Sequence, residues 1–247
     1  MFTDTHCHIF DEYYENIDVV KNEMENNSIY RVINNGTDAK SNIEVIDKVS
    51  KYDWMYGAIG IHPESVDNYK EEDIDYIISN LDKVIAIGEI GLDYYYTKDN
   101  KQEQIALFEK QLKIAEDNNM PVIIHSRDAT MDTINTLKKY KVKGVIHSFS
   151  GSYETAMDYI KMGYKIGING VITFKNCNIK DVIKRIDVNN ILLETDSPYL
   201  TPVPFRGKQN NPSHIKEISE FVANIYGISI KELSIITEKN IREVFDI

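Results

Sequence analysis

The chain has 247 residues and a formal net charge of -11, with 42% hydrophobic and 27% charged residues. This length and composition allow one large α/β domain with a sizeable core. An acidic chain does not bind long duplex DNA through a general positive field, so a nucleic-acid partner would have to be held at a local site.

Two features of the sequence favour a cytoplasmic protein. Its two cysteines, Cys7 and Cys177, are too few for a disulfide framework. The sequence has no N-terminal basic segment followed by an apolar run, and no apolar stretch of the roughly 18 residues that a membrane span needs. We therefore expect no membrane association, and no obligate protein partner is evident.

Short apolar runs alternate with longer amphipathic segments along the whole chain. The predicted strands are Phe2–Ile9, Tyr30–Asn34, Met55–Ile61, Val84–Ile90, Pro121–Ser126, Gly144–Phe149, Lys165–Gly170 and Ile191–Thr195. The predicted helices are Asn16–Asn26, Asp38–Tyr52, Glu71–Leu81, Lys101–Asn118, Ala129–Tyr140, Tyr153–Met162, Ile179–Ile186, Pro212–Tyr226 and Ser229–Phe245.

This alternation predicts an α/β fold in which parallel βαβ units close into a (β/α)8 TIM barrel, with further helices at the C-terminus. An open doubly wound sheet is the competing architecture, but no Gly-x-Gly-x-x-Gly follows the first strand. No linker-like stretch divides the chain, so residues 1–247 are expected to form one domain. The irregular segment Ser197–Pro212 follows the last strand, where a barrel carries an active-site loop.

The first predicted strand contains the triplet His6-Cys7-His8. Side chains two apart in a strand point to the same face, so His6 and His8 should project together while Cys7 faces the core. Two neighbouring imidazoles suit a metal ion, although a short motif of this kind also occurs as a pair of ordinary half-buried histidines.

Polar residues recur at the C-terminal ends of the predicted strands, and these ends meet at one mouth of a barrel. Five of the six histidines lie there, and two carboxylates occupy matching places: His6, His8, His62, His125, His147, Glu89 and Asp196. Their coincidence predicts a metal site at the mouth. The sixth histidine, His214, lies in the final helical region and is expected to be structural.

The segments that carry these residues form an ordered series. They are Asp4-Thr-His-Cys-His8, Gly60-Ile-His-Pro63, Gly88-Glu-Ile-Gly-Leu-Asp-Tyr94, Pro121-Val-Ile-Ile-His-Ser-Arg127, His147-Ser-Phe-Ser-Gly151 and Glu194-Thr-Asp-Ser-Pro-Tyr-Leu-Thr-Pro202. Together they resemble the motifs of the TatD family of metal-dependent hydrolases, many of them deoxyribonucleases, within the amidohydrolase-type barrels. One departure is Asn211, which stands where the family usually carries a glutamate before a proline.

The resemblance implies two bound divalent metal ions, with Zn, Mg and Mn as candidates. The implied ligand set is His6, His8 and Asp196 for one ion, His125 and His147 for the other, and Glu89 bridging both. Asp196 and Glu89 are then the catalytic carboxylates, and Asp196 is suited to orient the attacking water or to take its proton.

Three further residues are candidates for substrate binding. His62 resembles a family residue that contacts substrate, and a histidine held by its local turn is the alternative. Arg127 and Arg206 match phosphate oxygens in two-point geometry. Arg127 has the alternative of an ion pair with Asp93 or Glu194, which are interpreted as supports of the metal ligands.

The segment Tyr94-Tyr-Tyr96 has two interpretations. Its rings offer stacking faces to nucleic-acid bases, or they pack against the protein as loop aromatics usually do.

The leading hypothesis is a metal-dependent deoxyribonuclease that cleaves the phosphodiester bonds of single-stranded or frayed DNA through a water activated by two metals. The alternative is a metal-dependent hydrolase of a small amide, lactone or phosphoester. A non-enzymatic binding protein with a relic site is the third possibility, and the complete ligand set argues against it.

Overall fold

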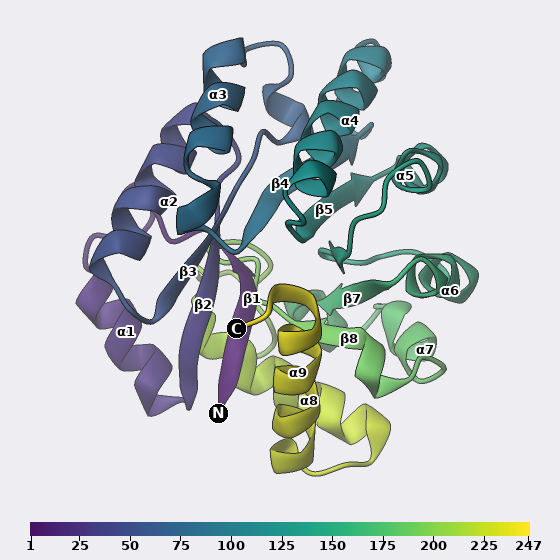
Figure 1. Cartoon of the computed structure of the whole chain (residues 1–247). Helices are drawn as coiled ribbons and strands as arrows, with labels where there is room; N and C mark the ends of the chain where they lie inside the picture. Colours follow the sequence, from purple (N-terminus) through teal and green to yellow (C-terminus); the bar gives the residue numbers. More distant parts are fainter.

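The computed structural model describes all residues from 1 to 247. Eight parallel strands form one sheet in the order β1-β2-β3-β4-β5-β6-β7-β8, and helices cover the outside of this sheet (Figure 1). The sheet curves into a nearly closed barrel, so the predicted (β/α)8 architecture is confirmed.

The strands are β1 Phe2–Cys7, β2 Ile29–Asn35, β3 Met55–Ile59, β4 Ala86–Asp93, β5 Val122–Arg127, β6 Gly144–Ile146, β7 Tyr164–Ile168 and β8 Ile191–Leu193. The α-helices are α1 Ile17–Asn26, α2 Ala39–Lys51, α3 Glu71–Ser79, α4 Lys101–Asp117, α5 Thr130–Leu137, α6 Tyr153–Lys161, α7 Ile179–Ile183, α8 Ile215–Tyr226 and α9 Ile230–Phe245. Short 3-10 helices are η1 Pro63–Ser65, η2 Leu81–Lys83, η3 Gly170–Thr173, η4 Val188–Asn190 and η5 Pro212–His214. None of the helices combines the length and the apolarity that crossing a membrane requires.

The strand boundaries differ from the sequence prediction where the chain approaches the mouth. Strand β4 continues past Ile90 as far as Asp93, because its last residues keep pairing with β5, ending at Asp93 opposite Arg127. Strand β6 stops at Ile146, three residues before the predicted end, and Ser148 then adopts a left-handed backbone with φ of 48°.

The inside of the barrel changes from apolar to polar along the strands. Successive residues of a strand face opposite sides, so residues two apart share the inner face. On three strands an inward apolar residue is followed two positions later by an inward polar one: Ile123 and His125, Val145 and His147, Leu192 and Glu194. The apolar layer supports the polar layer above it.

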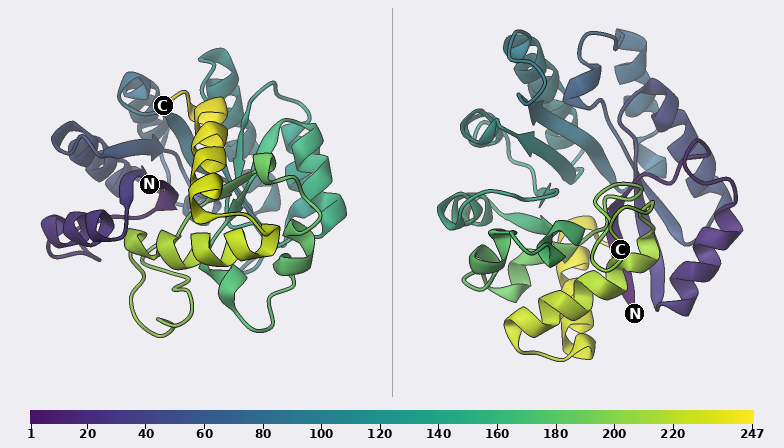
Figure 2. Two further views of the ribbon diagram at one scale, coloured as in Figure 1. Left: turned by 90° about the horizontal axis from the view of Figure 1, so that it is seen from below. Right: turned by 180° about the vertical axis from the view of Figure 1, so that it is seen from behind.

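Helix α9 closes the other end of the barrel. Its buried side chains, including Val244 and Phe245, pack against the inward apolar residues of the strands. At the strand starts, Glu238 of α9 accepts hydrogen bonds from Thr3 Oγ1 at 2.9 Å and Arg31 Nη2 at 2.7 Å. Figure 2 shows α9 lying across this end when the molecule is seen from below.

Helix α4 has the apolar face that its sequence predicts, with Leu107, Phe108, Leu112 and Ala115 all buried. We predict that Leu112→Ala lowers the free energy of unfolding by about 2–5 kcal/mol, because it leaves a cavity under the helix. Urea denaturation of chelator-treated protein measures this loss without a contribution from metal binding.

The matched control is Ile235→Ala on α9, where the side chain is 63% exposed. Its effect should stay within about 0.5 kcal/mol. Equal losses in the two variants would contradict the assignment of the α4 face to the core.

Candidate metal centre

The barrel closes at its mouth through hydrogen bonds between β1 and the segment after β8. The Asp196 amide donates to His6 O at 2.9 Å, and the His8 amide donates to Ser197 O at 2.7 Å. Cys7 lies between the two histidines, is fully buried and faces the core, as predicted from the strand alternation. The closure therefore brings three predicted site residues, His6, His8 and Asp196, together from opposite ends of the chain.

A buried carboxyl group, that of Asp4, supports this closure from below. Its Oδ1 accepts the Thr195 amide at 2.9 Å and the His6 amide at 3.2 Å, and its Oδ2 accepts the Thr195 hydroxyl. Burial raises the pKa of Asp4 to about 8, against the lowering effect of these hydrogen bonds. Sequence reasoning missed this role, although Asp4 shares the strand face of His6 and His8.

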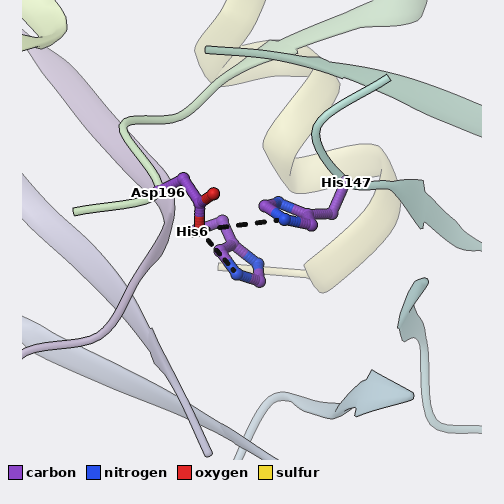
Figure 3. A group of neighbouring side chains, drawn as sticks. All are labelled: His6, His147 and Asp196. Carbon is purple, nitrogen blue, oxygen red and sulfur yellow. Dashed lines mark ion pairs between the residues drawn. The ribbon is translucent and has the colours of Figure 1, made fainter. Parts of the chain in front are cut away.

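The first cluster of donor atoms contains His6, His8, Glu89 and Asp196. The His6 and His8 Nε2 atoms are 3.2 Å apart, and Glu89 Oε2 lies 3.3 Å and 3.7 Å from them. Asp196 Oδ1 lies 3.7 Å from His6 Nε2, a pair drawn in Figure 3. The same oxygen lies 3.5 Å from His8 Nε2. Ligands in a tetrahedral site with bonds near 2.0–2.1 Å are about 3.3 Å apart, so this donor set fits a metal ion.

The second cluster surrounds the other oxygen of Glu89. Its Oε1 lies 2.9 Å from His125 Nδ1, 3.6 Å from His62 Nε2 and 3.7 Å from His147 Nε2. The two oxygens of one carboxylate thus face different imidazoles. Three triads in this region have the spacing of metal ligands, namely His6–His8–Glu89, His62–Glu89–His125 and His6–His147–Asp196.

Hydrogen bonds on the far side of each imidazole indicate which ring nitrogen is free. His8 Nδ1 lies 2.9 Å from the backbone oxygen of Asn35, to which it donates, so its Nε2 keeps a lone pair for a cation. His62 is the opposite case, because its Nδ1 accepts the Glu64 amide at 3.2 Å. The neutral His62 ring therefore carries its hydrogen on Nε2, and this atom is a donor at the mouth rather than a metal ligand.

His147 is held by an ion pair and by stacking. Its Nδ1 lies 3.0 Å from Glu194 Oε1, and its ring stacks on His6 with centroids 3.6 Å apart (Figure 3). Glu194 in turn accepts the Ser148 amide at 2.6 Å. Gly167 on β7 has no room for a side chain, because a Cβ there would lie 2.4 Å from Glu194 Oε2.

His125 lies between two carboxylates. Its Nδ1 faces Glu89, and its Nε2 lies 2.9 Å from Asp93 Oδ2. Burial disfavours charge on this ring, but the hydrogen bonds to Asp93 and Glu89 outweigh it and raise the pKa of His125 to about 9. Without a metal ion, His125 thus carries protons on both nitrogens at neutral pH.

The other imidazoles divide into charged and neutral ones. Burial disfavours charge on His147, yet Glu194, Asp196 and Glu89 together raise its pKa to about 10. Burial lowers the pKa of His62 to about 3, and repulsion from His125 adds to this effect. Burial and repulsion from His147 likewise lower the pKa of His6. A cluster of this kind, with strongly shifted pKa values at a barrel mouth, is typical of a functional site.

The remaining predicted residues are divided between the mouth and the surface. One pocket of about 630 Å³ is lined by Arg127, His62 and most of the predicted ligands. Arg127 makes no ion pair with Asp93 or Glu194, and its guanidinium instead lies 3.6 Å from the ring centroid of Tyr95. Arg206 is exposed outside that pocket and stacks over Phe174 at 4.1 Å.

Two polar residues of the C-terminal segment have structural roles. His214 Nδ1 lies 2.7 Å from Asn210 Oδ1, away from the mouth, as expected for a structural histidine. Asn211, the departure from the family pattern, accepts the Ser213 amide at 2.9 Å and donates to Glu23 Oε2 at 2.6 Å. It therefore caps η5 and touches none of the residues of the two clusters.

A parallel barrel with histidines and carboxylates gathered at its mouth has the construction of a metal-dependent hydrolase. The family model described as TatD related DNase matches residues 3–246. The chain belongs to the TatD family, and the resemblance found in its sequence is confirmed.

Individual relatives agree with this assignment. Metal-dependent hydrolase YabD of Bacillus subtilis is 38% identical over 254 residues, which cover 100% of both chains. Metal-dependent hydrolase YcfH of Escherichia coli K12 is 33% identical, with 99% of this chain and 95% of that protein aligned. The crystal structure of the TatD homolog YjjV from Escherichia coli K12 matches with a TM-score of 0.93 at 28% identity, covering 100% of this chain and 98% of that one.

We predict that metal binding strengthens as the pH rises. A histidine must lose a proton to become a ligand, and the raised pKa values of His125 and His147 keep both protonated at pH 7. Between pH 7 and 9 the affinity for Mn²⁺ should rise by up to about tenfold per pH unit for each proton released. Isothermal titration calorimetry in buffers of different ionisation enthalpy measures both the affinity and the proton release.

The metal-free protein should show the reverse trend in stability. A histidine with a raised pKa stabilises the fold fully below its unfolded pKa of about 6.5, and this contribution is lost as the pH rises through the folded pKa. The melting temperature of chelator-treated protein should therefore fall between pH 7 and 9. His214→Asn, outside the site, should leave this slope unchanged, and a melting temperature that rises with pH would contradict the assignment.

Proposed function

We propose that this protein is a deoxyribonuclease that uses two divalent metal ions to cleave phosphodiester bonds of single-stranded or frayed DNA. The observation that carries the proposal is the orientation of Glu89, whose two oxygens face two different groups of imidazoles. A carboxylate in this position suits a bridge between two ions. The family description as TatD related DNase supports DNA as the substrate.

In this proposal, His6, His8 and Asp196 would hold the first ion, His125 and His147 would hold the second, and Glu89 would be a ligand of both. Divalent ions bound there supply an acidified water and neutralise charge on the phosphate. Imidazole and carboxylate ligands suit Zn or Mn, and a site that works on phosphate also suits Mg.

Asp196 is the proposed proton acceptor. Burial disfavours its charge, but the imidazoles of His147, His8 and His6 outweigh it and lower the pKa of Asp196. It is therefore ionised at neutral pH and ready to accept a proton. Its backbone has a left-handed φ of 58°, a strained conformation that is common where a side chain must be aimed at a reacting group.

His62 is the proposed donor to the substrate. Its pKa of about 3 keeps the ring neutral, and its Nε2–H points into the mouth near Glu89. A neutral donor of this kind can hydrogen-bond a phosphate oxygen without competing for the metal ions.

The number of ions is the first test. We predict two divalent ions per chain by elemental analysis of protein purified without chelator, and one ion in the His6→Ala/His8→Ala variant, which removes two of the four proposed ligands of one site. His214→Ala is the matched control and should keep both ions. Unchanged metal content in the double variant would exclude His6 and His8 as ligands.

The second test separates catalysis from folding. Asp196→Asn keeps the size of the side chain and removes the proton acceptor, so cleavage of a single-stranded oligonucleotide should fall about a hundredfold or more. Asp181→Asn, which removes the same charge from an exposed position on α7, should retain activity. Cleavage by Asp196→Asn at the parental rate would contradict the role of this carboxylate.

Substrate range distinguishes the two candidate functions. Hydrolysis of a small activated phosphodiester or a lactone, with no cleavage of any oligonucleotide, would indicate the alternative of a small-molecule hydrolase. Cleavage of oligonucleotides by the parent protein in Mg²⁺, Mn²⁺ or Zn²⁺ would support the deoxyribonuclease.

A further inference from the structure

The mouth of the barrel has walls of different charge. The segments after β1 and β2 contribute acidic side chains, among them Glu12 and Asp38. Lys40 and Arg127 are the only lysine and arginine side chains that line the pocket. Lys40 Nζ forms an ion pair with Glu12 Oε2 at 3.6 Å, whereas Arg127 forms no ion pair. Arg127 is therefore the one lysine or arginine of the mouth that is free of an ion pair and able to meet an incoming phosphate.

Arg127 is accompanied by two exposed aromatic rings. Its guanidinium carbon lies 3.6 Å from the ring centroid of Tyr95 and 5.2 Å from that of Tyr96. The two rings meet edge to face with centroids 4.9 Å apart, and 57% of Tyr95 and 70% of Tyr96 remain exposed. Rings so exposed add little to the core, so packing does not account for them.

The aromatic pair is joined directly to the metal centre. Asp93 on β4 pairs with Arg127 on β5, and the Tyr94 amide donates to Arg127 O at 2.9 Å. Asp93 Oδ1 also accepts the Tyr95 amide at 2.8 Å, while its Oδ2 contacts His125. One carboxylate therefore holds both a proposed metal ligand and the start of the aromatic segment.

We propose that Tyr95, Tyr96 and Arg127 form a base-stacking subsite for single-stranded DNA, an inference that rests on the proposed nuclease function. A base of the strand stacks on the exposed tyrosine faces, and the guanidinium contacts an adjacent phosphate. Stacking needs a splayed base, so the subsite selects unpaired nucleotides over duplex. The strand follows the wall formed by β4 and β5 and avoids the acidic wall formed after β1 and β2.

Equilibrium binding tests the subsite without requiring cleavage. The probe is a fluorescent single-stranded oligodeoxynucleotide with phosphorothioate linkages that resist cleavage, measured by anisotropy with the metal-loaded protein. Adding Tyr95→Leu and Tyr96→Leu should weaken binding about tenfold, because stacking on an aromatic side chain contributes about 1–3 kcal/mol per base. Tyr95→Phe and Tyr96→Phe keep the rings and should bind like the parent.

Arg127 has a matched control elsewhere in the chain. Arg185 also lies 3.6 Å from a tyrosine ring centroid, that of Tyr153, but neither residue lines the mouth. Arg127→Ala should weaken oligonucleotide binding, and Arg185→Ala should not. Equal effects of the two substitutions would overturn the proposal, because Arg127 would then act only through its positive charge and not through its position at the mouth.

A series of abasic oligonucleotides identifies the stacking contact itself. Each probe lacks one base but keeps every phosphate. At one position, loss of the base should weaken binding by the parent about tenfold and should have no further effect on the leucine variants. If the leucine substitutions weaken binding of every abasic probe as much as that of the intact strand, the rings do not stack on a base.

A small activated phosphodiester separates this proposal from the proposed function. The leucine variants should hydrolyse it at the parental rate, because it has no base to stack. Oligonucleotide binding that depends on the tyrosines, without any cleavage by the parent, would refute the nuclease and retain the subsite. Cleavage of oligonucleotides with no loss in binding or rate in the leucine variants would retain the nuclease and refute the subsite.

Discussion

The closure between β1 and the segment after β8 is the constraint on which the candidate metal centre depends. Residues nearly two hundred positions apart share its backbone hydrogen bonds, and the buried carboxyl group of Asp4 connects Thr195 to His6. Because His6, His8 and Asp196 lie directly on these bonded segments, the spacing of their donor atoms is set by the backbone. A side-chain contact alone would hold them less rigidly, since each ring could turn away.

The buried carboxylates at the mouth need positive charge to balance them. Glu89 and Asp196 are buried among imidazoles, and a buried carboxylate is stable only with compensating positive charge. In the metal-free protein, protons on His125 and His147 supply that charge. Under the proposed ligand assignment, a divalent ion bound beside Glu89 and Asp196 would replace these protons as the source of positive charge.

Much of this arrangement could be predicted from the sequence because strands have a period of two. An inward Ile123 or Val145 implies an inward His125 or His147, and parallel strands bring such residues to one end. The orientation of each ring could not be predicted, because it depends on partners such as the Asn35 carbonyl and the Glu64 amide. These contacts come from neighbouring strands and turns whose register no local pattern reveals. For the same reason, the sequence could not predict whether Arg127 forms an ion pair.

Helix α9 covers the strand starts, and this limits how molecules enter and leave the site. With Phe245 and its neighbours filling the lower end, the barrel is a blind pocket with a single entrance. A chain-like molecule cannot pass through such a pocket as a thread passes through a ring. Whatever enters must leave by the way it came, so each departing product vacates the same opening that the next molecule uses. Such a pocket suits free ends and exposed loops, which can be inserted and withdrawn.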